Sequence, residues 1–189
     1  MQVAFSIVLY LCLVLLISDV SHGLSIRPSE ALKSIVKLTS SSEYGLNSAN
    51  NAAIIELIEG ILRAGKQKNA AIEGCWDLIW TTEKETLFFA RNGLFGRKCA
   101  SISQTITKET IFNTINFTGN SKFEVEGSVE QNDRRTNFVF RKAVLSYPPL
   151  PPLQLPPVGK GWFDTLYADA QFRVSADIRG DYLLSRRRS

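Results

Sequence analysis

Histidine is almost missing from this sequence of 189 residues, which contains His22 and no other. Ser–His–Asp and Cys–His catalysis and His-ligated metal sites all need that residue type. The nucleotide-binding patterns G-x-G-x-x-G and G-x-x-x-x-G-K-[ST] and the hydrolase pattern G-x-S-x-G are absent too. Asp164 and Asp169 could act as an acid–base pair, but no other feature supports catalysis. We therefore expect no enzyme, no catalytic residue, no metal site and no cofactor.

Cysteine is scarce as well, with Cys12, Cys75 and Cys99. Cys75 and Cys99 could form a disulfide in an oxidising compartment, or a redox-controlled pair in a plastid. Two unpaired thiols is the simpler interpretation, because spacing alone does not show whether the two Cα atoms come within bridging distance.

No lysine or arginine precedes the apolar segment Val3–Ile17, which itself carries no charge. This segment is short for a membrane span, which needs about 20 residues. It fits the apolar core of a signal peptide, and Ser21 and Gly23 put small residues at the −3 and −1 positions of a cleavage site. We predict a cleaved signal peptide over residues 1–23, with a retained membrane anchor as the alternative.

Removal of residues 1–23 would take away His22, Cys12 and Asp19 and leave 22 basic against 17 acidic residues, a net charge of +5. Part of this excess is Arg186–Arg188 near the C-terminus. Such a tail would suit an anionic membrane surface, but a short basic tail is more often simply solvated.

Apolar residues recur at helical spacing after the leader. Ser29 is a candidate N-cap for a stripe that begins at Ala31. A second helix is predicted over Asn51–Ala64, and its broad apolar face could cover one open end of a barrel. We assign residues 24–50 to a transit or linker segment and residues 51–186 to the folded domain.

From Ile72 onward the apolar period becomes two, which is typical of strands. A first strand contains Trp76, Leu78 and Trp80 on one face. Further strands are predicted over Ser101–Thr107, Thr110–Asn116, Lys122–Val129, Thr136–Leu145, Phe172–Ile178 and Tyr182–Ser185. Regular spacing without intervening helices indicates a mainly β fold, an antiparallel barrel or sandwich with one or two N-terminal helices. About eight strands is the barrel size that can enclose one small apolar ligand.

The inward-facing candidates of three strands are mostly large and apolar: Trp76, Leu78, Trp80, Phe123, Val125, Phe138 and Phe140. An apolar ligand needs a cavity lined by such side chains, because its burial contributes about 25 cal/mol per Å² removed from water. The same residues could instead fill the barrel completely, and periodicity does not decide between the two alternatives.

The segment Tyr147–Pro157 (YPPLPPLQLPP) is rich in proline, which fixes φ and donates no backbone hydrogen bond. We predict an extended connection rather than a central strand. An SH3- or WW-type ligand is the alternative, but such ligands usually lie in disordered tails, whereas predicted strands flank this segment.

Two segments carry a more specific pattern. Gly74–Thr82 (GCWDLIWTT) resembles the first barrel strand of the plastid lipid-associated (fibrillin) proteins, G-x-W-x-L-x-Y-T-T, with Trp80 at the usual tyrosine position. Residues 148–184 resemble the family's C-terminal signature: a proline-rich run, G-W-x-D-T-x-Y-x-D, R-V and a glycine turn. The matching positions are Gly161, Trp162, Asp164, Thr165, Tyr167, Asp169, Arg173 and Gly180. The resemblance covers roughly residues 50–186.

This resemblance implies a lipocalin-like barrel at plastoglobules or thylakoids that handles carotenoids, quinones or other prenyl or acyl lipids. The implied partners are an apolar lipid ligand and, peripherally, a lipid monolayer or membrane. No nucleic-acid partner is expected, and the oligomeric state stays open.

The charged residues of the C-terminal motif also have structural interpretations. Asp164 follows Trp162 in a turn-like segment, where its carboxylate could accept hydrogen bonds from backbone N–H groups. Arg173 could pair with Asp164 or Asp169 at the barrel mouth. Direct contact of these residues with a lipid headgroup is the alternative.

Two short motifs point elsewhere. Arg179-Gly180-Asp181 spells an integrin-adhesion tripeptide, but a glycine-centred turn between strands is the commoner explanation. Asn116-Phe117-Thr118 is a glycosylation sequon, which matters only if the chain meets the ER lumen.

The apolar leader differs from a plant transit peptide, which is rich in serine and arginine. A fibrillin-like domain behind a signal peptide favours an alga whose plastid is reached through the ER.

Two other classes of function stay open. One is a secreted lipocalin-type carrier, glycosylated at Asn116 and bridged by Cys75 and Cys99. The other is a lipid-droplet coat protein without an internal ligand, attached through its terminal arginines and an exposed apolar rim.

Overall fold

The computed structural model describes residues 27–64, 71–156 and 159–188. The predicted signal peptide, residues 1–23, lies outside these ranges. Within them, no helix is both long enough and apolar enough to cross a membrane.

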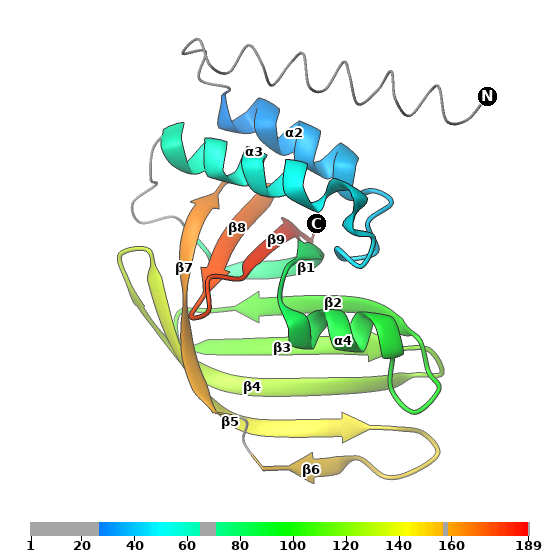
Figure 1. Cartoon of the computed structure of the whole chain (residues 1–189). Helices are drawn as coiled ribbons and strands as arrows, with labels where there is room; N and C mark the ends of the chain where they lie inside the picture. The colour runs from blue at the N-terminus through cyan, green and yellow to red at the C-terminus, as the bar shows by residue number, and fades with distance from the viewer. Residues whose placement is uncertain (1–26, 65–70, 157–158, 189) are drawn as a thin grey trace, which may run out of the picture.

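Two helices, α2 and α3, precede the strands along the chain, and one further helix, α4, lies between the first two strands (Figure 1). In order the elements are α2 (Pro28–Thr39), the 3-10 helix η2 (Ser48–Asn50), α3 (Asn51–Ala64), β1 (Gly74–Thr81), α4 (Lys84–Asn92), β2 (Cys99–Ile106), β3 (Thr110–Phe117), β4 (Ser121–Asn132), β5 (Arg135–Ser146), β6 (Leu153–Leu155), β7 (Lys160–Ala168), β8 (Phe172–Asp177) and β9 (Tyr182–Arg187).

Eight of these strands close into an antiparallel barrel. The sheet runs β4-β3-β2-β1-β9-β8-β7-β5, and the additional pairing of β4 with β5 joins its two ends. Short connections link β2, β3, β4 and β5, as the turn-forming residues between them predict. The mainly β barrel with N-terminal helices that the sequence indicates is confirmed.

Strand β5 shares one edge between two partners. Its first part, from Arg135 to Val139, pairs with β7. Farther along, Ala143–Leu145 pair with the three-residue strand β6, which lies within the proline-rich segment. Since β6 has no other neighbour in the sheet order, the barrel wall is interrupted between β6 and the strands β7–β9.

A bulge in β1 divides its large side chains between two faces of the sheet. Leu78 pairs with Ser185 and Trp80 with Leu184, so the register shifts by one residue between them. One residue of shift turns a side chain to the opposite face. Trp76 and Leu78 therefore point into the barrel, whereas Trp80 points outward, on the face of Leu184.

The outward face around Trp80 is covered by α2 and α3. Their buried residues form one cluster with this part of the barrel: Ala31, Leu32, Ile35, Ile54, Ile58, Ile61, Trp80, Val174 and Leu184. The indole Nε1 of Trp80 donates a hydrogen bond to Asn51 Oδ1 at 2.9 Å. Helix α3 thus packs on the outer wall and does not cover an open end, because the bulge provides an apolar outer face for it.

Helix α2 lies within residues 24–50, which the sequence analysis assigned to a transit or linker segment. Its first residue is Pro28, a favoured residue at that position. Arg27 occupies the N-cap, and Ser29, the expected cap, lies inside the helix. Since Ala31, Leu32 and Ile35 are buried, α2 belongs to the folded core.

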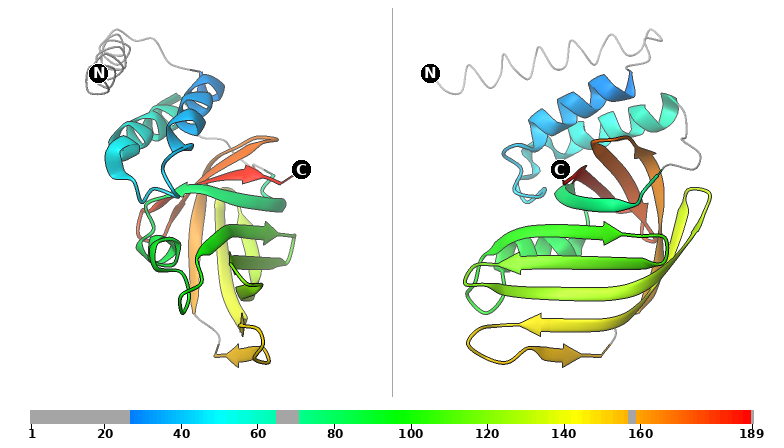
Figure 2. Two further views of the ribbon diagram at one scale, coloured as in Figure 1. Left: turned by 90° about the vertical axis from the view of Figure 1, so that its right-hand side faces the viewer. Right: turned by 180° about the vertical axis from the view of Figure 1, so that it is seen from behind.

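Helix α4 is an element that strand periodicity did not predict. Figure 2 (left) shows α4 end-on, facing the curved sheet of β2–β5. The Phe89 ring of α4 stacks on Phe123 with a centroid distance of 6.2 Å and meets Phe117 edge-on at 6.3 Å. Phe123 and Phe117 point inward by register, so α4 covers part of the interior where the barrel wall is interrupted.

Trp80→Ala should lower the free energy of unfolding by about 3–5 kcal/mol, because it leaves a cavity under α2 and α3. Chemical denaturation of the purified protein measures this loss. Phe112→Ala is the control, since Phe112 lies exposed on β3, and its cost should be about 0.5 kcal/mol or less. Equal losses for both variants would show that Trp80 does not hold the helices on the barrel.

Candidate functional site

One row of apolar side chains crosses five neighbouring strands on the inner face of the sheet. The register pairs Ile102 with Ile115, Ile115 with Phe123, Phe123 with Leu145, and Leu145 with Leu153. Paired residues point to the same face of a sheet, and Phe89 of α4 lies against Phe123 on that face. We call these five residues, Ile102, Ile115, Phe123, Leu145 and Leu153, the apolar row.

The apolar row is not sealed from water. Ile102, Ile115, Phe123 and Leu145 are only half-buried, and Leu153 is exposed, although all five belong to the inner wall. Solvent therefore reaches the inner wall between α4 and the β5–β6 end of the sheet.

The row ends in an apolar groove at this open end. The groove has a volume of about 370 Å³ and is lined by Phe95, Leu145, Tyr147, Leu150, Pro151 and Leu153. We call these six residues the apolar mouth. Three of them are highly exposed: Phe95 by 76%, Leu150 by 64% and Leu153 by 56%. Exposed apolar side chains gathered in one place are more typical of surfaces that contact another molecule than of an ordinary protein surface.

Arg97 braces the loops around the apolar mouth. Its guanidinium lies 3.8 Å from the centre of the Tyr147 ring and donates to the carbonyl oxygens of Gly119 and Pro148. A third hydrogen bond of 2.6 Å reaches Ser121 Oγ. The Tyr147 hydroxyl in turn donates to the Phe95 carbonyl at 3.1 Å. The loop that carries Phe95 is thereby tied to the loop that carries Leu150.

The other end of the barrel contains a buried apolar cluster. Ile72, Ile106, Ile111 and Phe163 form a buried cluster, with Val129, Phe138 and Phe140 packed against it. Trp76 is fully buried, and its Nε1 donates to the Ile72 carbonyl at 2.7 Å. The interior thus has a packed end and an open end.

The candidate lining residues divide between these environments. Trp76 and Leu78 lie buried on the inner face of β1, and Trp80 lies in the cluster beneath α2 and α3. Phe123 belongs to the apolar row, and Val125 is buried one inward position farther along β4. Phe138 and Phe140 point inward but remain half-buried, with ring centroids 4.8 Å apart.

Arg173 lies inside the barrel and not at its mouth. Its side chain is buried, and its guanidinium lies 5.1 Å from the centre of the Trp76 ring and 5.5 Å from that of Phe163. It donates a hydrogen bond to Gln104 Oε1. Burial, with a smaller contribution from the nearby charge of Arg187, lowers the pKa of Arg173 to about 9.

The expected ion pairs of Arg173 with Asp164 or Asp169 are not formed. Asp164 lies in strand β7, not in a turn, and accepts hydrogen bonds from Arg135 on the outer face at 2.9 and 3.1 Å. Asp169 accepts from the Tyr167 hydroxyl at 2.8 Å and from two backbone N–H groups of the β7–β8 turn. Burial, with the hydrogen bond to Asp169, raises the pKa of Tyr167 to about 12.

Other motif positions have local structural roles. Gly74 begins β1 with φ +133°, and a Cβ there would lie 2.1 Å from Arg187 Nη1. A Cβ on Gly161 would lie 2.8 Å from the Phe138 ring. The Trp162 ring stacks under Arg135 at 3.7 Å. Gly180 occupies the β8–β9 turn with φ +82°.

Cys75 and Cys99 are free thiols. Cys75 pairs with Thr105, and Cys99 lies six residues from Thr105 along β2, roughly 20 Å at about 3.4 Å per residue. A disulfide needs Cα atoms closer than about 7 Å, so the candidate bridge is not formed. Asn116, the sequon residue, is half-buried on β3 and donates from Nδ2 to Ser101 Oγ at 3.0 Å.

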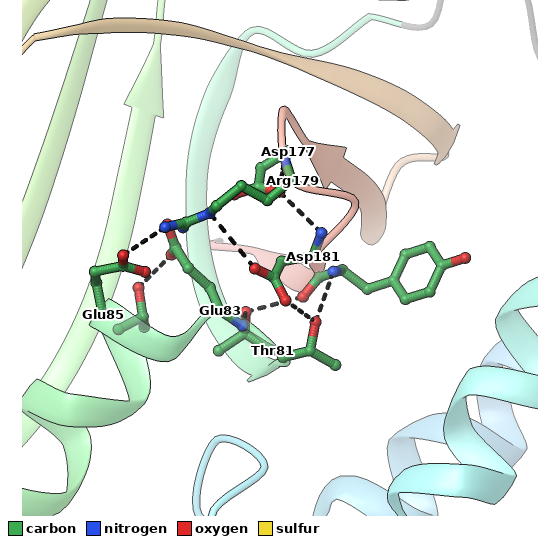
Figure 3. Close-up of polar contacts among 9 residues, drawn as sticks. Thr81, Glu83, Glu85, Asp177, Arg179 and Asp181 are labelled. Carbon is green, nitrogen blue, oxygen red and sulfur yellow. Dashed lines mark hydrogen bonds and ion pairs between the residues drawn. The ribbon is translucent and has the colours of Figure 1, made fainter.

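The charged residues of the Arg179-Gly180-Asp181 tripeptide form ion pairs and hydrogen bonds with residues at the start of α4. Figure 3 shows the Arg179 guanidinium between the carboxylates of Glu83, Glu85 and Asp181. Its Nη2 lies 3.3 Å from Glu83 Oε1 and its Nε 3.6 Å from Asp181 Oδ2. Asp177 accepts from the same guanidinium at 3.2 Å. We call Arg179 and these four carboxylates the α4 latch, since they join the β8–β9 turn to α4.

The pKa values of the two glutamates in the α4 latch shift in opposite directions. Burial raises the pKa of Glu83, against the hydrogen bond from Thr86 and the charge of Arg179. The hydrogen bond from Arg179 lowers the pKa of the exposed Glu85 carboxyl. In the described part of the chain, no group of three or more His, Cys, Asp or Glu side chains has the geometry of a metal site.

Comparison with known proteins gives two similarities. The PAP_fibrillin family model matches residues 29–185. A protein of Arabidopsis thaliana, "Probable plastid-lipid-associated protein 11, chloroplastic", is 35% identical over 165 residues, which cover 82% of this chain and 77% of that protein. No solved structure matches this chain significantly.

Arg179→Ala should loosen the attachment of α4, because it removes the cation shared by four carboxylates. A loss of about 1 kcal/mol corresponds to roughly fivefold faster amide exchange in α4, which hydrogen–deuterium exchange measures. Arg63→Ala is the control, since Arg63 makes a single exposed ion pair with Glu59 on α3.

The effect of Arg179→Ala should also depend on pH. Because Arg179 lowers the pKa of Glu85 below its ordinary value of 4.5, the pair stabilises the fold fully above that pH. This contribution is lost as the pH falls through the lowered pKa. Unchanged α4 exchange in the variant at neutral pH would show that the latch does not position the helix.

Proposed function

The chain belongs to the PAP/fibrillin family, and from this premise we propose that it binds apolar lipid, without catalysis, through the open end of its barrel. The observation that carries the proposal is the continuity of the apolar row with the apolar mouth. Leu145 and Leu153 belong to both, so one uninterrupted apolar surface leads from beneath α4 to the outside.

The dimensions of this surface suit a long, thin ligand. Four inter-strand steps separate Ile102 from Leu153, roughly 19 Å at about 4.8 Å per step. The groove volume of about 370 Å³ falls within the usual range of small-molecule sites, about 300–1,000 Å³. All six side chains of the mouth are apolar or aromatic. Acyl and prenyl lipids, carotenoids and quinones have this combination of shape and polarity.

The proline-rich segment supports the mouth mechanically. Proline restricts φ and reduces the conformational entropy lost on ordering a loop. Leu150 and Leu153 stand between prolines in this segment, and Arg97 holds its start at the Pro148 carbonyl. The two exposed leucines therefore lie on a stiff, extended connection between strands. This arrangement agrees with the predicted extended connection and differs from the disordered tails in which SH3- or WW-type ligands usually lie.

The site of action in this proposal is a plastid lipid surface, a plastoglobule or a thylakoid. The chloroplastic relative supports the plastid. The predicted signal peptide over residues 1–23, with residues 24–50 following it, would bring the chain there through the ER; α2 makes the second of these segments part of the fold as well.

A lipid-droplet coat protein without an internal ligand is the second candidate. Phe88 on α4, exposed by 60%, together with Phe95, Leu150 and Leu153, gives the open end an apolar rim that could enter a lipid monolayer. Lipid extracted from the purified protein separates the two candidates. One lipid molecule per protein by mass spectrometry favours a carrier, and no retained lipid favours a coat.

Leu150→Asp should weaken attachment to lipid droplets at least about tenfold, because a fully buried leucine contributes about 1.5–3 kcal/mol. Flotation with triolein droplets coated by phosphatidylcholine measures this attachment. The experiment uses the mature protein as it is purified from cells. Val139→Asp is the control: Val139 is 41% exposed but lies on the outer face of β5 and is not among the residues of the mouth. Flotation of the Leu150 variant equal to that of the control would contradict the proposed surface.

A further inference from the structure

Arg173 is a buried charge that has no counter-ion among the described residues. Its side chain is 2% exposed, and no described carboxylate pairs with it. Within residues 27–64, 71–156 and 159–188, its Nε and Nη1 have no hydrogen-bond acceptor. A second cation, Arg187, lies close enough to lower the pKa of Arg173 further. Burying a charge is costly unless it is paired and hydrogen-bonded. An anion bound beside Arg173 would therefore stabilise the interior.

Two further buried groups in the same interior lack partners. The hydroxyls of Thr136 and Thr165 have no hydrogen-bond partner in the part of the chain that the structure describes. Both point inward by register: Thr136 pairs with Phe163, and Thr165 pairs with Ser175, which is two residues from Arg173 on the same strand face. A guanidinium and two hydroxyls with unused donors therefore face the inside of one barrel.

The polar site adjoins the apolar row. Gln104, which accepts from Arg173, stands two residues from Ile102 on the same face of β2, about 7 Å along the strand. Ile102 begins the apolar row. An elongated molecule could thus place one end at Arg173 and lay the rest along the row toward the mouth.

We propose that Arg173 binds the carboxylate of a long-chain fatty acid, whose hydrocarbon tail lies along the apolar row toward the apolar mouth. This inference rests on the proposed lipid-binding function and names its ligand class. A carboxylate supplies one negative charge and two acceptor oxygens, which match the unused Nε and Nη1 donors of Arg173. A neutral carotenoid or quinone would leave the Arg173 charge uncompensated.

The charge state of the site favours this ligand at physiological pH. Although burial lowers the pKa of Arg173 to about 9, the guanidinium remains protonated at neutral pH. A fatty acid is ionised there, with an ordinary carboxyl pKa near 4 to 5. The pair would therefore form as a charge-assisted contact in a low-dielectric interior, where such contacts are strongest.

The test compares cis-parinaric acid, a fluorescent fatty acid, with its methyl ester, which has the same tail and no charge. We expect the protein to bind the acid at least about tenfold more tightly, as one hydrogen-bonded charge contact provides. Arg173→Met should remove this preference while leaving affinity for the ester unchanged. Arg135→Met is the matched control, since Arg135 stacks on Trp162 on the outer face, and it should keep the preference.

Stability supplies a second readout. If Arg173 waits for an anion, Arg173→Met should not lower the melting temperature of the lipid-free protein, because it removes an unpaired buried charge. A purely structural role predicts a clear drop. Should the methionine variant fail to fold, that failure contradicts the proposal unless Arg173→Lys, which keeps the charge, folds and retains part of the preference for the acid.

The failures of the two proposals are distinguishable. Equal binding of acid and ester by the unmodified protein would overturn the role of Arg173 and leave the lipid-binding function standing. Binding of neither probe would overturn both. Tighter binding of dodecyl phosphate than of laurate would show that the site serves a phosphate headgroup and would overturn the assignment to a fatty acid.

Discussion

The division of one edge of β5 between β7 and β6 is the constraint on which the open end of this barrel depends. A strand edge offers each backbone group to one neighbour only, so where Ala143–Leu145 pair with β6, β7 cannot complete the wall. The inner side chains opposite that gap lose the cover that a closed barrel gives them. Helix α4 replaces part of this cover through Phe89, and the apolar mouth is what remains uncovered.

Bulges allow the same strands to serve two apolar layers. In β1 the shift between Leu78 and Trp80 turns Trp80 toward the helices, and in β7 the shift between Thr165 and Tyr167 does the same for Tyr167. Before each bulge, in chain order, the large side chains point into the barrel. After the bulge, Trp80 and Tyr167 point outward and pack against α2 and α3. The packed end and the helical cover thus come from local register changes, and they hold rigid the scaffold on which the open end is built.

Periodicity predicted the regular parts of this structure and failed where register changes. Phe123 and Val125 could be placed on one face from sequence because β4 runs without a bulge through them. Trp80 could not, since alternation alone puts it beside Leu78. Helix α4 was missed because its apolar residues Leu87–Phe89 form one short consecutive run. The partners of Arg173 could not be predicted either: motif spacing suggests Asp164, but strand β7 turns that carboxylate outward toward Arg135.

Two departures from ordinary protein chemistry occur in this barrel. Large apolar side chains are exposed at the mouth, and a cation that is unpaired among the described residues is buried in the interior beside Trp76 and Phe163; each alone would destabilise a protein without a ligand. Local rules of this kind are usually broken at functional sites. An apolar ligand would relieve only the first departure and a small anion only the second. A molecule with a hydrocarbon tail and one anionic end relieves both, and the spacing between Gln104 and Ile102 lets a single chain do so.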